Sequence, residues 1–366
     1  MEGLNKVPVS VQEMGVRIFG AGPAGTRTAE LLAKAGHDVT VYEEHDEIGK
    51  PVQCTGILTN AVEDVLEIPD RVVDFKINKV RVHSPNARLD ITFTKPNLVV
   101  DRTKLDNWLA KKAKKAGASI ETGVKLLRPG ITLKVKTSRG VEYWKHETTI
   151  GADGPHSRIA KHINPHLRRE YFAGLQATIE SDNDGAIEFY PFIKNIAWAT
   201  PESNDRMRIG VMSRLNIKTS FEKLKKLFPG RILSTQSGTI PYYQPELKRS
   251  EKGFYLIGDA AGMVKATTGG GIVQALKAAP LLTEAITKNK NWDALWKRKQ
   301  GTDLWLHRKI REKLDKFNEN DWDELLQDCS PPSIMKILNE VPRDYTKSMM
   351  TKLVMRKPAL MKYAFK

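Results

Sequence analysis

The sequence predicts an α/β fold with a Rossmann-like nucleotide-binding domain, an inserted antiparallel sheet and a helical C-terminal region. Three observations support this fold class. Residues 16–43 have the order strand, glycine turn, helix and strand. Short alternating apolar runs, typical of antiparallel strands, follow from residue 75 and again from residue 171. After Pro280 the sequence pattern is helical and rich in lysine and tryptophan.

The nucleotide-binding element begins with the motif Gly20-x-Gly22-x-x-Gly25 after an apolar strand. In this spacing the first glycine makes the turn, the second lets backbone approach a pyrophosphate, and the third lets the helix pack on the strand. The helix N-terminus then faces the phosphates. Glu43, at the end of the second strand, is placed to accept hydrogen bonds from ribose hydroxyls. In this stretch we expect cofactor contacts from Gly20, Gly22, Ala24, Gly25, Glu43 and Glu44.

Two further glycine motifs identify the dinucleotide. Residues 253–262 form a strand that ends in Gly-Asp and leads to a glycine-rich helix entry, and residues 149–158 contain Asp-Gly. In this order the motifs resemble those of FAD-dependent oxidoreductases of the p-hydroxybenzoate hydroxylase type. The resemblance implies that the Gly-Asp aspartate bonds the flavin ribityl chain and that the next helix points its N-terminus at the flavin. It implies cofactor contacts from Asp153, Gly154, Asp259, Gly270, Gly271 and Ile272.

A third resemblance to this superfamily lies at residues 101–109, which are similar to its Asp-Arg-x-x-(Phe/Leu)-Asp helix start. It implies that Arg102 contacts FAD, although a surface capping role would fit the same position. Val124, after the next predicted strand, is where the superfamily holds the adenine by backbone contacts.

The pattern Gly49-x-Pro51-x-x-Cys54-x-Gly56 is more specific. It resembles the geranylgeranyl reductase family, flavoproteins that saturate isoprenoid double bonds, including archaeal enzymes that act on digeranylgeranylglycerol lipids. The resemblance implies that Cys54 lies beside the reactive face of the flavin and is catalytic. The alternative for Cys54 is a small buried apolar side chain.

The predicted substrate-binding residues are Trp198 and Tyr190. The family carries Tyr-x-Trp-x-Phe-Pro on one strand; Trp198 and Pro201 match it, whereas Ile196 and Thr200 depart from it. These departures leave the fold prediction unchanged and the substrate open. Because single aromatic residues on strands usually pack in a core, ordinary packing is the alternative for Trp198.

The motif order predicts a discontinuous domain organisation. The FAD-binding domain comprises residues 14–75, 98–165 and 250–290. The substrate-binding antiparallel sheet comprises residues 76–97 and 166–249, and the C-terminal helical region residues 291–366. Residues before Val16 are predicted to form a short, poorly ordered arm.

The composition limits the partners. The net charge of +16 favours phosphate-rich surfaces, and an anionic membrane surface fits better than nucleic acid because no nucleic-acid motif is present. A solvated lysine-rich surface with no such partner is the alternative. Residues 347–366 combine basic and apolar side chains without acidic ones, which suits an interfacial segment as well as an ordinary solvated helix. No signal pattern or apolar run of membrane-spanning length appears, and we expect a cytoplasmic protein, with a peripheral position on the inner face of the cell membrane as an additional hypothesis. Two cysteines fit a reducing compartment, and no metal site is expected.

The leading hypothesis is therefore a flavin-dependent reductase that saturates geranylgeranyl double bonds of membrane-lipid precursors by hydride transfer from reduced FAD. The electron donor would be external, either ferredoxin or NAD(P)H, because no second nucleotide unit is found. An FAD-dependent monooxygenase or halogenase of an aromatic or polyketide substrate is the alternative. A basic membrane or nucleic-acid binder that retains a nucleotide fold is a third hypothesis.

Overall fold

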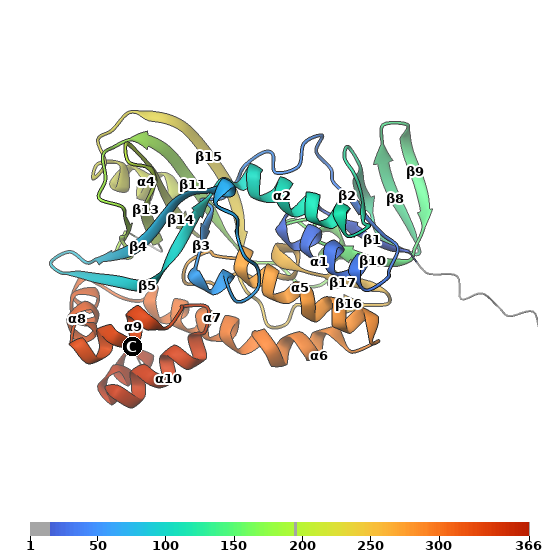
Figure 1. Ribbon diagram of the computed structural model, residues 1–366. Coiled ribbons are helices and arrows are strands. Elements are labelled where there is room, and N and C mark those ends of the chain that lie inside the picture. The colour runs from blue at the N-terminus through green and yellow to red at the C-terminus, as the bar shows by residue number, and fades with distance from the viewer. Residues whose placement is uncertain (1–14, 194–195, 366) are drawn as a thin grey trace, which may run out of the picture.

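The computed structural model describes residues 15–193 and 196–365. Apart from Gly15, the arm predicted before Val16 lies outside the described residues. Figure 1 shows a parallel-sheet unit beside a strongly curled second sheet, with the C-terminal helices along one side of both. None of the helices in the described ranges is long and apolar enough to cross a membrane.

The first sheet has six strands in the order β16-β17-β10-β1-β2-β6. β1, β2, β6, β10 and β17 pair in parallel, and the edge strand β16 pairs antiparallel with β17. Their bounds are β1 (Val16–Phe19), β2 (Val39–Tyr42), β6 (Ser119–Glu121), β10 (Thr148–Gly151), β16 (Ser250–Glu251) and β17 (Phe254–Leu256). The three segments that carry the predicted glycine motifs therefore lie side by side in this sheet, although they are far apart in the sequence.

Four helices belong to the parallel-sheet unit: α1 (Pro23–Lys34), α2 (Arg102–Lys115), α3 (Arg158–Ile163) and α5 (Ile272–Thr287). α1 packs against both α2 and α5. Pro23 is the first residue of α1, where its missing N–H costs no hydrogen bond. α2 is capped by the Asp101 side chain, whose Oδ1 accepts from Lys104 N at 2.9 Å.

The second sheet has eight strands in the order β15-β11-β14-β13-β12-β4-β5-β3. Its pairs are antiparallel except for β4 with β12, which is parallel. The bounds are β3 (Ile57–Leu58), β4 (Val73–His83), β5 (Arg88–Val100), β11 (Tyr171–Glu180), β12 (Ala186–Phe189), β13 (Ile196–Ser203), β14 (Arg206–Ser213) and β15 (Ile232–Pro241). α4 (Ile217–Lys225) packs on β11, β13 and β14. This sheet is the predicted inserted unit, and it also takes in β3 from the loop that follows the nucleotide-binding element.

The face of this sheet under α4 differs from the opposite face. Ala197, Ala199, Ile209 and Val211 form one core with Phe221 and Leu224 of α4. Because side chains alternate along a strand, the intervening residues of β13 and β14 point the other way. Trp198 packs there in a separate cluster with Phe172, Met212, Ile240 and Ala266. We call this second face, which carries Trp198, the inner face of the sheet.

A small third sheet lies at the far end of the parallel-sheet unit (Figure 1). It comprises β7 (Lys125–Arg128), β8 (Thr132–Thr137) and β9 (Gly140–Lys145) in antiparallel order. β7 begins directly after Val124, so this sheet fixes the position of one wall of the nucleotide site.

The C-terminal region is helical, as predicted. It comprises α6 (Trp292–Trp296), α7 (Thr302–Leu314), α8 (Glu319–Cys329), α9 (Pro332–Glu340), α10 (Thr346–Arg356) and α11 (Lys362–Phe365). Trp292 and Trp296 are fully buried, and Trp292 Nε1 donates to the Leu256 carbonyl at 3.0 Å. A buried ion pair between Lys265 and Asp344, 2.7 Å apart, joins the segment before α5 to the segment before α10.

Candidate functional site

The glycine turn after β1 has the geometry that its spacing predicts. Gly20 has φ +105°, and a Cβ there would lie 2.2 Å from the Ala152 carbonyl oxygen of β10's following loop. A Cβ at Gly25 would lie 2.0 Å from the Gly20 oxygen. By contrast, no atom lies within 4 Å of a Cβ built at Gly22. The turn is therefore closely packed at Gly20 and Gly25 and open at Gly22, where a pyrophosphate would approach.

Glu43 closes the turn from β2. Its Oε2 accepts from Ala21 N at 2.8 Å, and its Oε1 accepts from His45 N at 3.0 Å. The Glu43 carbonyl accepts from Val124 N at 2.8 Å, so the chain around Val124 is held beside the turn. Glu44 forms an ion pair with Lys125 at 2.7 Å. One carboxylate thus orders the glycine turn and stands at the end of β2, where the sequence predicts ribose binding.

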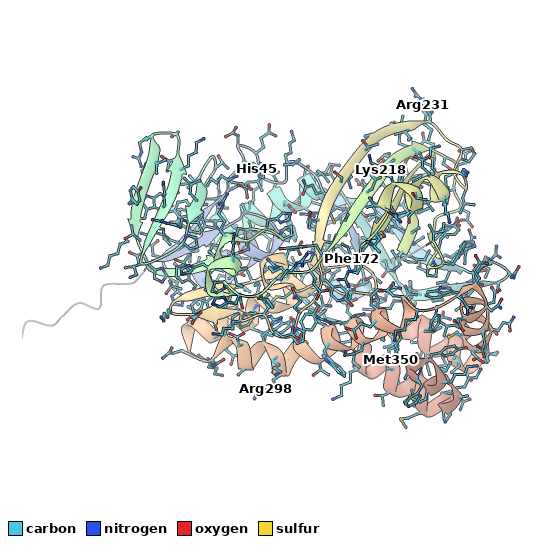
Figure 2. All side chains as sticks on the ribbon, turned by 180° about the vertical axis from the view of Figure 1, so that it is seen from behind. His45, Phe172, Lys218, Arg231, Arg298 and Met350 are labelled. Carbon is cyan, nitrogen blue, oxygen red and sulfur yellow. The ribbon has the colours of Figure 1, made fainter. Side chains whose placement is uncertain are left out.

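A cavity of about 440 Å³ lies over this turn. That volume is in the usual range for small-molecule sites. Eight predicted cofactor residues line it: Gly20, Gly22, Glu43, Glu44, Arg102, Val124, Asp153 and Gly154. His45, Lys125, Pro155, His156 and Arg158 also line it. Figure 2 shows His45, one of these lining residues, at the outer edge of the parallel-sheet unit.

Asp153 contributes a buried carboxylate to the cavity wall. Its Oδ2 accepts from Arg158 N at 2.9 Å. Its Oδ1 is buried and has no hydrogen-bond partner among the described residues. Burial raises the pKa of this carboxyl. A buried acceptor without a partner is costly, so a bound group with a donor would stabilise the site.

Arg102 lies at the start of α2, on the same cavity wall. Its Nε and Nη2 donate to the two oxygens of Asp106 at 3.1 and 2.8 Å. Burial acts to lower the pKa of Arg102, but the Asp106 carboxylate and the nearby Cys54 sulfur hold it above its usual range. A surface capping role is excluded by this geometry, because Arg102 is mostly buried and Asp101 caps the helix. Asp106 was not among the predicted site residues, although the quoted motif ends on it.

The remaining predicted cofactor residues lie next to this cavity, outside its lining. A Cβ at Gly258 would lie 2.8 Å from Ala24 Cβ, which brings the Gly-Asp strand end against α1. A Cβ at Gly271 would lie 3.0 Å from Asp259 Oδ1, so the N-terminus of α5 meets the aspartate directly. Burial raises the pKa of Asp259, and the charge of Arg102 opposes that rise. Gly270 and Ile272 flank Gly271 at the start of α5.

Arg169, which sequence reasoning missed, connects two of the motifs. Its guanidinium donates to the Pro155 and Asp259 carbonyls at 2.7 and 2.8 Å. It thereby ties the Asp-Gly loop to the Gly-Asp loop. No local pattern marks Arg169, because its partners are distant in the sequence.

Cys54 lies in the loop of residues 50–56, which we call the Cys54 loop. Its Sγ accepts from Gly56 N at 3.4 Å, and its side chain is half-buried rather than part of the core. Gly56 has φ +82°, and a Cβ there would lie 2.3 Å from the Val100 carbonyl oxygen. Pro51, Val52 and Gln53 of the same loop line the cofactor cavity. Cys54 is therefore adjacent to that cavity and to Arg102, and its catalytic role beside the flavin stays a prediction.

The two predicted substrate residues are not brought together. Trp198 lies on the inner face of the sheet, flat against Gly210, where a Cβ would come within 2.4 Å of the indole ring. Its Nε1 and the neighbouring Thr200 Oγ1 are buried without partners in the described part of the chain. Tyr190 packs in the core under α4; its hydroxyl donates to Glu188 at 2.5 Å and its ring stacks on His83. Tyr190 therefore packs on the face under α4 and Trp198 on the inner face, and both substrate contacts stay predictions.

The inner face is next to the glycine-rich loop before α5. A Cβ at Gly269 would lie 2.8 Å from Met212 Sδ, and Ala266 packs in the cluster of Trp198. Figure 2 shows Phe172 of the same cluster between the two large sheets. The inner face and the predicted flavin-facing helix N-terminus therefore meet at the junction of the two units.

No group of three or more His, Cys, Asp or Glu side chains in the described ranges could hold a metal ion. The polar groups present are instead donors, namely backbone amides at glycine turns and helix starts and the Arg102 guanidinium, and acceptors, namely the carboxylates of Glu43, Asp153 and Asp259. The donors suit a pyrophosphate, and the carboxylates suit hydroxyl groups. The site therefore fits a dinucleotide with a sugar-alcohol chain.

Comparisons with known proteins agree with this geometry. Residues 13–180 match the family model of an FAD binding domain. The chain is 27% identical to the digeranylgeranylglycerophospholipid reductase of Methanocaldococcus jannaschii, over 95% of this chain and 96% of that protein. It is 29% identical to the geranylgeranyl diphosphate reductase of Synechocystis sp., over 75% of this chain and 76% of that protein.

Solved structures share the fold. A geranylgeranyl bacteriochlorophyll reductase-like protein from Thermoplasma acidophilum superimposes with a TM-score of 0.83 at 21% identity, over 95% of this chain and 98% of that one. A flavin-dependent halogenase superimposes with a TM-score of 0.70 at 16% identity, over 96% and 78% of the two chains.

The domain match, the glycine motifs and the cavity together define the class: the chain is an FAD-dependent oxidoreductase. Within that class it is similar to geranylgeranyl reductases over most of its length, in agreement with the family resemblance predicted from the sequence.

Proposed function

We propose that this protein is a flavin-dependent reductase that saturates carbon–carbon double bonds in the geranylgeranyl chains of membrane-lipid precursors. The observation that carries the proposal is the position of the Cys54 loop, which lines the cofactor cavity on one side and contacts the inner face of the eight-stranded sheet on the other. The reductase names of relatives that match at least three quarters of this chain support the same substrate class.

The chain's own residues would hold and orient both reactants. The turn at Gly20–Gly25, Glu43 and Asp153 would hold the adenosine and pyrophosphate end of FAD. Asp259 and the start of α5 would hold its ribityl and flavin end. When bound and reduced, FAD supplies a hydride equivalent to one alkene carbon.

An isoprenoid alkene offers no charge for the protein to bind, so orientation and exclusion of water must supply most of the catalysis. The apolar cluster of Phe172, Ile196, Met212 and Ile240 around Trp198 would provide a dry wall. The other alkene carbon must receive a proton. The Cys54 thiol is our candidate for its source, and Arg102 would stabilise the thiolate left behind.

The electron donor would be external, either NAD(P)H or ferredoxin. In the described ranges, β1, α1 and β2 form the one strand, glycine-turn and helix unit of Gly-x-Gly-x-x-Gly type. A nicotinamide donor would therefore bind transiently at the same flavin site.

The decisive experiment is anaerobic. The purified protein is reduced with dithionite, a digeranylgeranylglycerol phospholipid is added, and flavin absorbance and lipid mass are followed together. We expect reoxidation with products that gain hydrogen in pairs, and a Cys54→Ala variant that keeps FAD but loses most of this reaction. A flavin that stays reduced until oxygen is admitted would overturn the proposal and favour a monooxygenase or halogenase.

A further inference from the structure

The Cys54 loop has no helix or strand of its own between residues 50 and 56. A reactive side chain on such a loop keeps its position only if other elements hold the backbone. The loop leads directly into β3, and its Gly56 carbonyl accepts from Val100 N at 2.9 Å. This bond fixes the end of the loop but leaves Cys54 and Thr55 to be held by other groups.

Three side chains of the eight-stranded sheet hold these two residues. Gln236 Nε2 donates to the Cys54 carbonyl at 3.1 Å. Arg208 Nη1 donates to the Thr55 carbonyl at 2.7 Å. Gln176 Oε1 accepts from the Thr55 hydroxyl at 2.5 Å. Gln236, Arg208 and Gln176 come from β15, β14 and β11, three adjacent strands of one rigid sheet.

The arrangement of the three groups is set by the sheet register. Gln176 and Gln236 are directly opposite each other on β11 and β15. Arg208 is opposite Thr178 on β11, two positions from Gln176. All three side chains reach the Cys54 loop, which covers the inner face at this point. A Cβ at Gly238 would lie 3.3 Å from Gln53 Cβ, so the loop is also in van der Waals contact with β15.

Arg208 is itself held firmly. Only 12% of its side chain is exposed, and its guanidinium pairs with Asp74 at 2.9 Å and with Glu202 at 2.6 Å. These carboxylates offset the cost of burying the cation and fix its orientation. Lysine could not make the same set of bonds, because it lacks the planar fork of five donors.

We propose that Gln176, Arg208 and Gln236 are positioning residues that set the place of Cys54 between FAD and the alkene. This inference rests on the proposed function. The three residues act through the loop, by two of its backbone carbonyls and the Thr55 hydroxyl, whereas Cys54 itself would face the reacting groups. A displacement of about 1 Å in such a loop can cost about 100-fold in rate, while cofactor binding stays unchanged.

The test uses the full chain with Cys329→Ser as background, which leaves Cys54 as its single thiol. Cys329 is on α8, remote in sequence from the site, and burial raises its thiol pKa to about 11. Arg208→Gln and Gln236→Leu are compared with the matched control Arg231→Gln. Arg231 makes an exposed ion pair with Glu180 on the same sheet and does not touch the Cys54 loop.

Three quantities are measured: FAD content, the rate of Cys54 alkylation by iodoacetamide, and anaerobic flavin reoxidation by the lipid or by ferricyanide. In both variants we expect normal FAD content, reoxidation by lipid slowed at least about tenfold, and reoxidation by ferricyanide within about twofold of the control. Release of the loop should raise the alkylation rate at least about threefold.

The proposal is overturned if both variants match Arg231→Gln in alkylation and lipid reaction, or if alkylation changes without any change in lipid reaction. If Arg208→Gln does not fold, Gln236→Leu decides, because it removes a single hydrogen bond from a half-exposed side chain. If the unsubstituted protein does not reduce the lipid, the proposed function fails. Equal alkylation rates in that case would overturn the positioning role as well.

Discussion

The carbonyl of Gly20 and the backbone of Gly25 are so close that a Cβ at position 25 would lie 2.0 Å from the Gly20 oxygen. At Gly22, between them, no atom lies within 4 Å of a Cβ built on the backbone, and φ has an ordinary value of −71°. Three glycines of one motif are thus required for different reasons. Two of them allow the fold, and the third leaves room for a ligand.

This difference gives a prediction for Gly25→Ala and Gly22→Ala. Gly25→Ala forces β1 and α1 apart, and we expect a loss of stability of about 1–3 kcal/mol or more together with loss of FAD. Gly22→Ala places a methyl group where the pyrophosphate would approach, and it strains nothing in the apoprotein. We expect its apoprotein melting temperature to stay within about 2 °C of the unsubstituted apoprotein, while FAD binds at least about tenfold more weakly.

Calorimetry of the apoproteins and FAD titration monitored by flavin fluorescence measure both effects. Equal loss of stability in the two variants would contradict this division of roles.

A second prediction concerns the indole of Trp198, which lies on Gly210. A Cβ at Gly210 would be 2.4 Å from the ring, so Gly210→Ala must displace Trp198. Gly174, on the adjacent strand β11, is the matched control, because a Cβ there would meet Ile240 at an ordinary 3.4 Å. We expect Gly210→Ala to lose about 1–3 kcal/mol and to slow reoxidation by the lipid, and Gly174→Ala to do neither.

Urea unfolding and single-turnover reduction check this prediction. If both alanine variants reduce the lipid at the same rate, Trp198 does not shape the substrate wall.

These particulars also show what the sequence can and cannot predict. The positions of Gly20, Gly22, Gly25 and Glu43 follow from local spacing, because strand, turn and helix are set within some thirty residues. The separation of Trp198 from Tyr190 does not follow, because it depends on which face of the sheet α4 covers. In the register of β12 with β13, Phe189 lies opposite Trp198, so Tyr190, the next residue, points to the other face; no local signal gives that register.

The side chains that hold the Cys54 loop were also beyond prediction. Gln176, Arg208 and Gln236 are ordinary polar residues on strands, more than a hundred positions away from Cys54. Only the curled sheet brings them together at one loop. The Lys265–Asp344 pair is a similar case, since it joins the glycine-rich loop to the C-terminal helices without any motif.

A third prediction concerns pH. His307 is buried between Thr267 and Thr346, whose hydroxyls lie 2.7 Å from Nδ1 and Nε2, respectively. Burial, with a smaller effect of Lys265, lowers the pKa of His307 to about 3. The unfolded chain takes up a proton at this histidine near pH 6.5, and the folded chain does not. Stability should therefore fall as the pH falls from about 6.5 towards 3, by up to about 1.4 kcal/mol per pH unit from this group.

His307→Gln should reduce the slope of unfolding free energy against pH between pH 6.5 and 5 by up to about 1.4 kcal/mol per pH unit, which corresponds to one proton. His166→Gln, a substitution at an exposed histidine, is the control and should leave this slope unchanged. Urea midpoints at several pH values give the slopes. Parallel curves for His307→Gln and the unsubstituted protein would contradict the prediction, because they would mean that His307 takes up its proton over the same pH range in the folded and unfolded chains.

The last prediction concerns membrane contact, which we propose for the C-terminal segment. Within residues 347–366, which the sequence predicts as a membrane-contacting segment, the structure limits the residues that can reach a membrane. Leu353 is buried, and Lys357 and Lys362 pair with Asp328 at 2.6 and 2.7 Å, so these residues are not free for a membrane. The exposed large apolar residues of this segment are Met355, Met361 and Phe365, and Lys347, Lys352 and Arg356 are exposed cations in the same segment. Figure 2 shows Met350 of α10 on the side of the molecule opposite Lys218 of α4 and Arg231, which precedes β15.

Shallow insertion of Met355 and Phe365 among the lipid headgroups would contribute about 1 kcal/mol each to the free energy of membrane binding. Each basic side chain near the anionic surface would contribute about as much. We therefore expect Met355→Asp with Phe365→Asp to weaken sedimentation with phosphatidylglycerol vesicles at least about tenfold, because each change also adds a repelled charge. Ile131→Asp is the control, since Ile131 is exposed in the turn between β7 and β8 of the three-stranded sheet, away from the C-terminal segment. Binding of the unsubstituted protein should weaken as salt rises, because the exposed cations are screened. If the double variant and the control sediment equally, the membrane contacts another surface or none, and the lipid must reach the flavin without this segment.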